Sequence, residues 1–271
     1  MATALRPLNT GELLDRTFQL YRAHFLLFVG IAALPQLFLL AYQLVGAVLA
    51  HPGIDPFQNL RWIGWALGAM LISFIVVAVA QAATVIAVSE VHLDRPISVI
   101  ESYSRVKHRF VEIIALIFVV SLATGFGLVL CIAPGIILLL MWSLAVPAAV
   151  LENKGLGDAL SRSQELSKGG WGRIFVVGLL FYVLRFAVAM LLQWPAIIVA
   201  TLFFRHNFEA TQALTQVASA VSGFVSGTLA APLATIAISL IYYDQRVRKE
   251  AFDLQYMMST MGGDPPQPAP A

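Results

Sequence analysis

Six long apolar runs occupy most of this 271-residue sequence and leave little chain for a soluble domain. A helix needs about 20 consecutive apolar residues to cross the hydrocarbon core of a bilayer. Only 12% of the residues are charged, whereas about a quarter are charged in soluble globular proteins. We predict an all-α integral membrane protein with six transmembrane helices in one polytopic domain, 1–256, and a disordered tail, 257–271. The expected spans are about 25–50, 62–89, 111–131, 134–151, 172–204 and 213–243.

The connections between the runs add local detail. Gly125, Gly127 and Pro134–Gly135 separate the third and fourth spans, which predicts a tight helical hairpin without charges. The fifth run has 33 residues, and tilting or a kink at Pro195 would fit it into a bilayer.

Cys131 lies among apolar residues, which predicts an inert packed thiol. The first run is too long for a signal-peptide core, so we expect it to stay as a signal anchor.

The basic residues are concentrated on one side of this topology. Fourteen of the 17 Lys and Arg residues lie in the N-terminal segment, the second and fourth connections and the C-terminal segment. Short loops rich in Lys and Arg stay in the cytoplasm, so both termini are expected there. Arg61 and Arg205 lie on the opposite side, and Arg185 lies inside the fifth span. The fourteen are Arg6, Arg16, Arg22, Arg95, Arg105, Lys107, Arg109, Lys154, Arg162, Lys168, Arg173, Arg246, Arg248 and Lys249.

A helical pattern recurs before the first, third and fifth spans. Leu14, Phe18, Tyr21 and Phe25 have the four-three-four spacing of one helix face. The spacing recurs 85 residues later and again 61 residues after that, and a hydroxyl position and a cation position follow the same offsets. The later copies are Val99, Tyr103, Val106 and Phe110, then Leu160, Gln164, Ser167 and Trp171; the hydroxyls are Thr17, Ser102 and Ser163; the cations are Arg22, Lys107 and Lys168.

We interpret the pattern as three pseudo-repeated units, each an interfacial amphipathic helix followed by an outgoing and a returning span. The apolar stripes would meet the acyl boundary, and the three cations would meet anionic head groups. The alternative is that any loop beside a span acquires charges and an aromatic residue. The third copy departs from the pattern, since Gln164 and Ser167 replace apolar residues. Thr10 is the expected N-cap of the first helix.

Acidic residues follow the last apolar turn of each returning span. They are Glu90, Glu152 and Asp244, which we call the exit acids. Each is expected to pair with the basic amphipathic helix of its own or a neighbouring unit and so to fix a cytoplasmic collar.

Arg185 is the sharpest polar anomaly within the spans. A charged residue at the centre of a span costs about 2.5–3.5 kcal/mol on insertion scales. One interpretation is an anion or lipid-phosphate site that faces the bundle interior or a cavity. The other is a structural cation that bonds helix carbonyls, or one that reaches the interface because the span is shifted.

The chain offers no convincing constellation for catalysis, metal binding or cofactor binding. Five histidines are scattered over both sides, and His92 between Glu90 and Asp94 is a weak metal pattern. The serines of the sixth span lack a credible base. The cytoplasmic cations are interspersed with acids, which disfavours nucleic acid and favours phospholipid head groups.

Three stretches carry a resemblance to a known family. They are 11–22 (GELLDRTFQLYR), 134–169 from Pro134-Gly135 through Pro147 and Glu152 to Lys168-Gly169, and 242–253 (YYDQRVRKEAFD). They resemble the multipass membrane domain fused to some bacterial glycerophosphodiester phosphodiesterases, and the related YciC-like inner-membrane proteins. The resemblance implies a bacterial inner-membrane location. We expect no phosphodiesterase domain in this sequence, because the six spans leave no residues to build its barrel. Its His-Arg-Gly motif is not matched either, since His108-Arg109 is followed by Phe110.

These observations favour a non-enzymatic membrane protein of structural or regulatory role. It would contact anionic lipids or other membrane proteins at its cytoplasmic face, in an oligomeric state that the sequence leaves open. The alternative is a transporter or permease for a small or lipidic substrate, with Arg185 in an anion site. Prolines within the spans fit that alternative, since broken helices often line transport sites. An intramembrane enzyme acting on lipids ranks last because the spans lack acid–base pairs.

Overall fold

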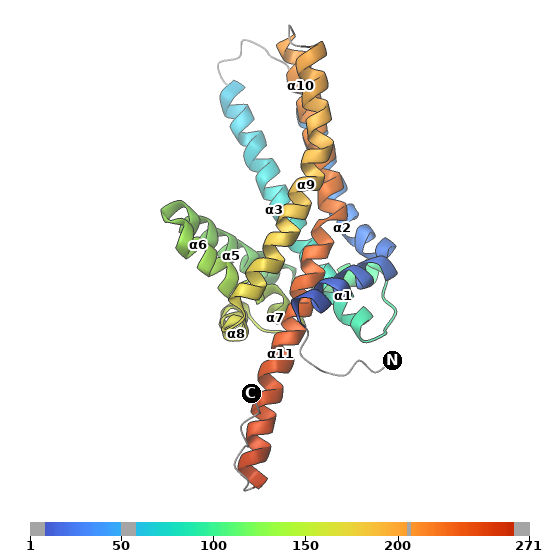
Figure 1. Ribbon diagram of the computed structural model, residues 1–271. Coiled ribbons are helices and arrows are strands. Elements are labelled where there is room, and N and C mark those ends of the chain that lie inside the picture. Colours follow the sequence, from blue (N-terminus) through green and yellow to red (C-terminus); the bar gives the residue numbers. More distant parts are fainter. Residues whose placement is uncertain (1–8, 50–57, 205–206, 263–271) are drawn as a thin grey trace.

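The computed structural model describes residues 9–49, 58–204 and 207–262, and this part of the chain is helical without strands (Figure 1). The eleven helices are α1 (Thr10–Ala23), α2 (Phe25–Leu49), α3 (Gln58–His92), α4 (Val99–Lys107), α5 (Phe110–Leu130), α6 (Ile132–Met141), α7 (Ala145–Leu151), α8 (Leu156–Ser167), α9 (Trp171–Phe203), α10 (Phe208–Leu229) and α11 (Ala231–Gly262). The predictions on Arg6, Arg205 and residues 263–271 lie outside the described residues. Residues 257–262 were expected in a disordered tail but belong to α11.

Six segments are long and apolar enough to cross a membrane, which confirms the expected number. Two of them are each built from two helices: the fourth joins α6 to α7, and the sixth joins α10 to α11. By contrast, α2 continues through Pro35 and α9 continues through Pro195. The segments are Phe25–Gly46, Ile63–His92, Phe110–Leu130, Ile132–Leu151, Trp171–Phe203 and Glu209–Glu250.

The hairpin between α5 and α6 turns on one residue, Cys131, whose backbone is extended. The two helices approach closely at a glycine pair. A Cβ on Gly135 would lie 2.6 Å from the backbone nitrogen of Leu128, and a Cβ on Gly127 would lie 3.0 Å from the Cα of Gly135. Only glycine fits at such a separation, as the expected tight turn requires. Cys131 itself is exposed at this turn, so the expectation of a packed thiol is wrong.

The long helices form a splayed bundle (Figure 1). α10 packs along α9 and α2, and α2 packs on α3, while the α5–α6 hairpin diverges to one side. The three short helices α1, α4 and α8 lie near one end of the spans, which we call the short-helix end. α11 passes this level and projects beyond it (Figure 1). The most buried side chains gather at this end and include Leu13, Val88, Leu144, Ile241 and Tyr242.

The short helices pack on the protein through the face that was expected to meet lipid. Leu14, Phe18, Val99, Tyr103 and Leu160 lie against the buried core. The expectation of a stripe at the acyl boundary is therefore wrong for most of its positions. The last residue of each stripe remains exposed, at 37–41% of its surface. These three residues are Phe25, Phe110 and Trp171.

Caps define where two of the short helices begin. Asn9, and not Thr10 as expected, is the N-cap of α1, because its side chain accepts a hydrogen bond from the Glu12 amide. The Glu12 carboxylate accepts in turn from the Asn9 amide at 3.0 Å, which completes a capping box. Ser98 caps α4 in the same way by accepting from the Glu101 amide.

Candidate functional site

Each short helix donates a side-chain hydroxyl to a span carbonyl at a point where the backbone hydrogen bonding of the span is interrupted, by a proline in one case and by a junction of two helices in the other two. The first case involves Pro35 of α2, which has no N–H to donate to the carbonyl of Ile31 four residues earlier. The Tyr103 hydroxyl of α4 donates to that carbonyl. Burial raises the pKa of Tyr103, so the phenol keeps its proton and remains a donor.

The second case lies at the junction of α10 and α11. Leu229 is the last residue of α10, and the last carbonyls of a helix have no donor within it. The Tyr21 hydroxyl of α1 donates to the Leu229 carbonyl at 2.8 Å. Pro232 follows in the first turn of α11, where its missing N–H costs nothing.

The third case lies at the junction of α6 and α7, where Ser163 of α8 bonds both sides of the break. Its hydroxyl donates to the carbonyl of Met141, the last residue of α6, at 2.9 Å. The same oxygen accepts from the amide of Leu144 at 3.1 Å. Ser167 adds a second hydroxyl on the Met141 carbonyl at 3.2 Å.

We call these interactions the break contacts. They come from one face of each helix, although not from equivalent positions. The hydroxyls at the shared offset, Thr17, Ser102 and Ser163, are all fully buried. Thr17 and Ser102, however, bond carbonyls of their own helices, those of Leu13 and Ser98. The spacing alone marked the two tyrosines as apolar stripe residues. The signal that could have found Tyr103 is that Pro35, inside a span, leaves a carbonyl that requires a donor from elsewhere.

The exit acids form ion pairs at the short-helix end. The Glu90 carboxylate lies 2.7 Å from Arg105 of α4, and that of Glu152 lies 3.1 Å from Arg162 of α8. The Asp244 carboxylate, only 1% exposed, lies 2.6 Å from Arg173, at the start of α9. Two of the three exit acids thus join the end of a span to the short helix that follows it.

Glu152 has the densest set of partners. Burial alone would raise its pKa, but hydrogen bonds from Tyr242, Lys154 and Arg162 lower the pKa of Glu152 to about 2. The same charge pairing raises the pKa of Arg162 despite its burial. A permanently charged cluster therefore joins α7, α8 and α11.

The candidate lipid-binding cations differ from the paired arginines. Arg22, Lys107 and Lys168 are exposed. Within the described ranges, none of them takes part in a hydrogen bond or an ion pair. Their charges are available for an external anion, whereas Arg105, Arg162 and Arg173 each lie within 3.1 Å of a carboxylate.

Arg185 does not occupy the interior position expected for an anion site. Its side chain is exposed on α9, and its neighbour Phe186 is 54% exposed. No hydrogen bond or ion pair of Arg185 is found within the described residues, so the expected bond to helix carbonyls is not observed either.

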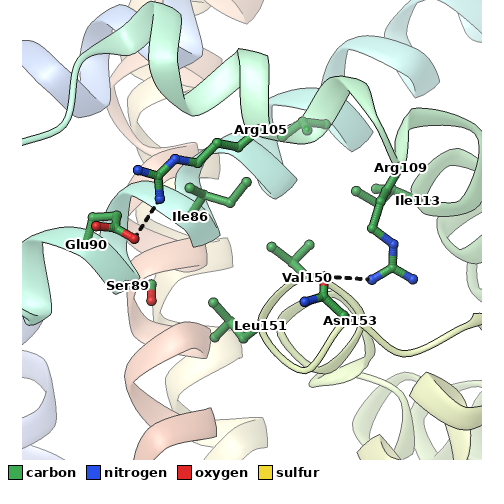
Figure 2. A pocket seen from close by; sticks show the side chains of 10 residues that line it. Ile86, Ser89, Glu90, Arg105, Arg109, Ile113, Val150, Leu151 and Asn153 are labelled. Atoms are coloured by element: carbon green, nitrogen blue, oxygen red, sulfur yellow. Dashed lines mark hydrogen bonds and ion pairs between the residues drawn. The ribbon is translucent and has the colours of Figure 1, made fainter.

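A cavity of about 290 Å³ opens at the short-helix end between α3, α4, α5 and α7 (Figure 2). Its polar lining combines Glu90 with four residues that were not singled out as candidate site residues from the sequence: Ser89, Arg105, Arg109 and Asn153. The four-residue spacing of Arg105 and Arg109 was visible in the sequence. The approach of Asn153 to Arg109, however, depends on the turn after α7. Over the described residues, no group of three or more His, Cys, Asp or Glu residues could hold a metal ion.

No protein-family model, no curated protein and no solved structure matches this chain. The resemblance to the multipass domain of the phosphodiesterases stays a prediction.

Proposed function

We propose that this chain is a non-enzymatic, multi-pass membrane protein of regulatory or structural role whose short helices respond to anionic lipids. In this proposal α1, α4 and α8 lie at the cytoplasmic interface of a bacterial inner membrane, with both termini in the cytoplasm. Arg22, Lys107 and Lys168 meet the head groups. Each helix also carries a break contact to a span.

The break contacts are the observation that carries the proposal. A helix that bonds a span through one face and offers an unpaired cation on its surface links the membrane surface to the bundle. Anionic lipid would hold the helix in place, and the helix would in turn hold the interrupted span. At these points the spans cannot satisfy their own backbone hydrogen bonds, because the carbonyls depend on a donor from another helix.

The distribution of basic residues supports the cytoplasmic placement. We further propose that the three short helices and their spans are pseudo-repeated units, related to the multipass domain named above. The shared burial of Thr17, Ser102 and Ser163 supports that relationship.

The alternative of a transporter with Arg185 in an anion site has no comparable support. Arg185 faces away from the core, and no acid in the described residues pairs with it. The break contacts fit a structural role without a substrate.

The experiment compares protein stability in nanodiscs with and without anionic lipid. We expect anionic lipid to raise the unfolding temperature of the wild type, and the combined variant Arg22→Gln, Lys107→Gln, Lys168→Gln to lose most of that gain. Each basic residue near an anionic surface contributes about 1 kcal/mol. Arg95→Gln is the matched control, since Arg95 is also exposed in a connection on the same side. Equal stabilisation of the wild type and the combined variant would contradict the proposal.

A further inference from the structure

The cavity of Figure 2 has the size and position of a head-group site. Its walls come from the ends of α3 and α7 and from α4 and the start of α5, where the charged residues of the chain gather. Its volume of about 290 Å³ is at the lower end of the range for ligand pockets. A polar head group fits such a space, whereas a whole lipid does not. Ile86, Val150 and Leu151 supply apolar wall beside the polar groups.

Of the two arginines in the lining, Arg109 is already fully used. It donates to the Glu112 carboxylate, to the Asn153 side chain and to the carbonyls of Ala149 and Lys154. It therefore holds this wall of the cavity in place and has no N–H group left to donate to a ligand. Its contact with the Oδ1 of Asn153 turns the amide nitrogen of that residue away from the guanidinium (Figure 2).

Arg105 and Asn153 retain donors for an anion. Arg105 donates one hydrogen bond to Glu90 and one to Glu101, and a guanidinium has five N–H groups. The two N–H groups of the Asn153 amide have no partner among the described residues. A phosphate oxygen is the acceptor that such donors prefer.

Glu90 provides the opposite charge. Arg105 is its ion-pair partner at Oε1, and no donor among the described residues occupies the second carboxylate oxygen. Ser89 lies beside it, and its oxygen already accepts from the Tyr243 hydroxyl. No aromatic ring is among the described residues that line this cavity. A quaternary ammonium prefers aromatic faces, whereas a primary ammonium donates hydrogen bonds to a carboxylate.

We propose that this cavity binds a phosphoethanolamine group, with the phosphate at Arg105 and Asn153 and the ammonium at Glu90. The group belongs either to a membrane lipid or to a free solute. The inference rests on the proposed position of α4 at the head-group layer. It concerns a different set of residues from the three exposed cations.

The binding experiment uses the full chain purified in detergent and titrated with short-chain lipids. We expect phosphatidylethanolamine to bind at least about tenfold more tightly than phosphatidylcholine or phosphatidylglycerol, the difference of one charge-assisted hydrogen bond. Free phosphoethanolamine is the second arm: binding of equal strength identifies a solute site, and weaker binding identifies a lipid site. Equal affinity for the ethanolamine and choline lipids would overturn the proposal.

Two variants and a control test the assignment of charges. Glu90→Gln should lose the preference for ethanolamine over choline and bind phosphatidylglycerol more tightly, a gain that a misfolded protein would not show. Asn153→Asp should weaken ethanolamine binding about tenfold; Asp tolerates the positive φ of 52° at this position. Arg95→Gln should change neither. Unaltered selectivity in Glu90→Gln, or unaltered affinity in Asn153→Asp, would overturn the proposal.

The two proposals fail separately. The Arg22, Lys107 and Lys168 variant should keep the ethanolamine preference while it loses the response to anionic lipid. If that response is missing in the wild type but the preference for ethanolamine remains, the proposed function is wrong and the cavity site stands.

Discussion

Tyr103 of α4 donates its hydroxyl hydrogen to the carbonyl that Pro35 leaves without a helical donor in α2. The two residues belong to different helices, and each brings a hydrogen-bonding requirement that the other helps to meet. Proline inside a span costs a backbone hydrogen bond, which is expensive where no water can replace it. A buried phenol likewise needs an acceptor. The pair satisfies both requirements with one contact and fixes α4 against α2.

This relationship predicts a double-mutant cycle. Tyr103→Phe leaves the Ile31 carbonyl without a partner, so we expect the free energy of unfolding to fall by about 1–3 kcal/mol. In the Pro35→Ala background the backbone amide at position 35 supplies the missing donor, and the same change should cost much less. Unfolding in detergent with increasing SDS measures all four proteins. The control is Tyr182→Phe, because Tyr182 is 68% exposed. An equal cost of Tyr103→Phe in both backgrounds would show that the contact does not depend on the proline.

Ser163 makes a second prediction at the α6–α7 break. Ser163→Ala removes the donor to Met141 and the acceptor for the Leu144 amide, and the site is fully buried. We expect a loss of about 1–3 kcal/mol in the free energy of unfolding. Amide hydrogen exchange should also become faster at Leu144, and Ser161→Ala on the exposed side of α8 should leave it unchanged. Slow exchange at Leu144 in Ser163→Ala would count against the role of this hydroxyl.

The sequence was sufficient for the gross fold because that part depends on local composition. Six apolar runs predict six span-capable segments without any knowledge of packing. The interruptions of the fourth and sixth spans were less accessible. The α6 helix ends at Met141, six residues before Pro147, and a proline in the first turn of a following helix does not show where the preceding helix ends.

The candidate site depended on contacts that no local pattern reveals. Tyr103 lies 72 residues from Ile31, and Tyr21 lies 208 residues from Leu229. Their spacing marked one face of a helix, and an aromatic on such a face is as compatible with lipid as with protein. Which of the two it meets is decided by the packing of α1 and α4 on the core, a tertiary property. The cavity depends likewise on the left-handed backbone of Asn153 after α7.

Glu152 makes the stability of the folded protein depend on pH. Its pKa is lowered to about 2 from the ordinary value of 4.5, so the folded state favours the ionised carboxylate. The resulting stabilisation, at most roughly 3 kcal/mol, is present above about pH 4.5 and is lost as the pH falls through about 2. We expect the wild type to lose its stability advantage over Glu152→Gln across this interval, measured by thermal unfolding in detergent. Glu165→Gln is the control, because its ion pair with Arg162 is solvent-exposed and its side chain is 67% exposed. A constant difference between wild type and Glu152→Gln from about pH 6 to about pH 2.5, a range chosen to bracket the loss, would contradict the role of this carboxylate.

Arg173 and Arg185 lie on the same helix and provide a matched pair for the last prediction. The Arg173 side chain is 14% exposed and lies 2.6 Å from the buried carboxylate of Asp244, whereas Arg185 is exposed. Arg173→Gln removes one of the two cations that neutralise the buried Asp244 carboxylate. The other, Arg248, stays 2.7 Å from the same oxygen, so the compensation is weakened but not lost. We expect a loss of about 3 kcal/mol in the free energy of unfolding. Asp244→Asn added to Arg173→Gln should recover part of it because the unbalanced charge is gone. Arg185→Gln should cause no measurable change in detergent. A loss after Arg185→Gln as large as that after Arg173→Gln would mean that Arg185 has a structural partner in the protein and would reopen the assignment of an anion site in α9.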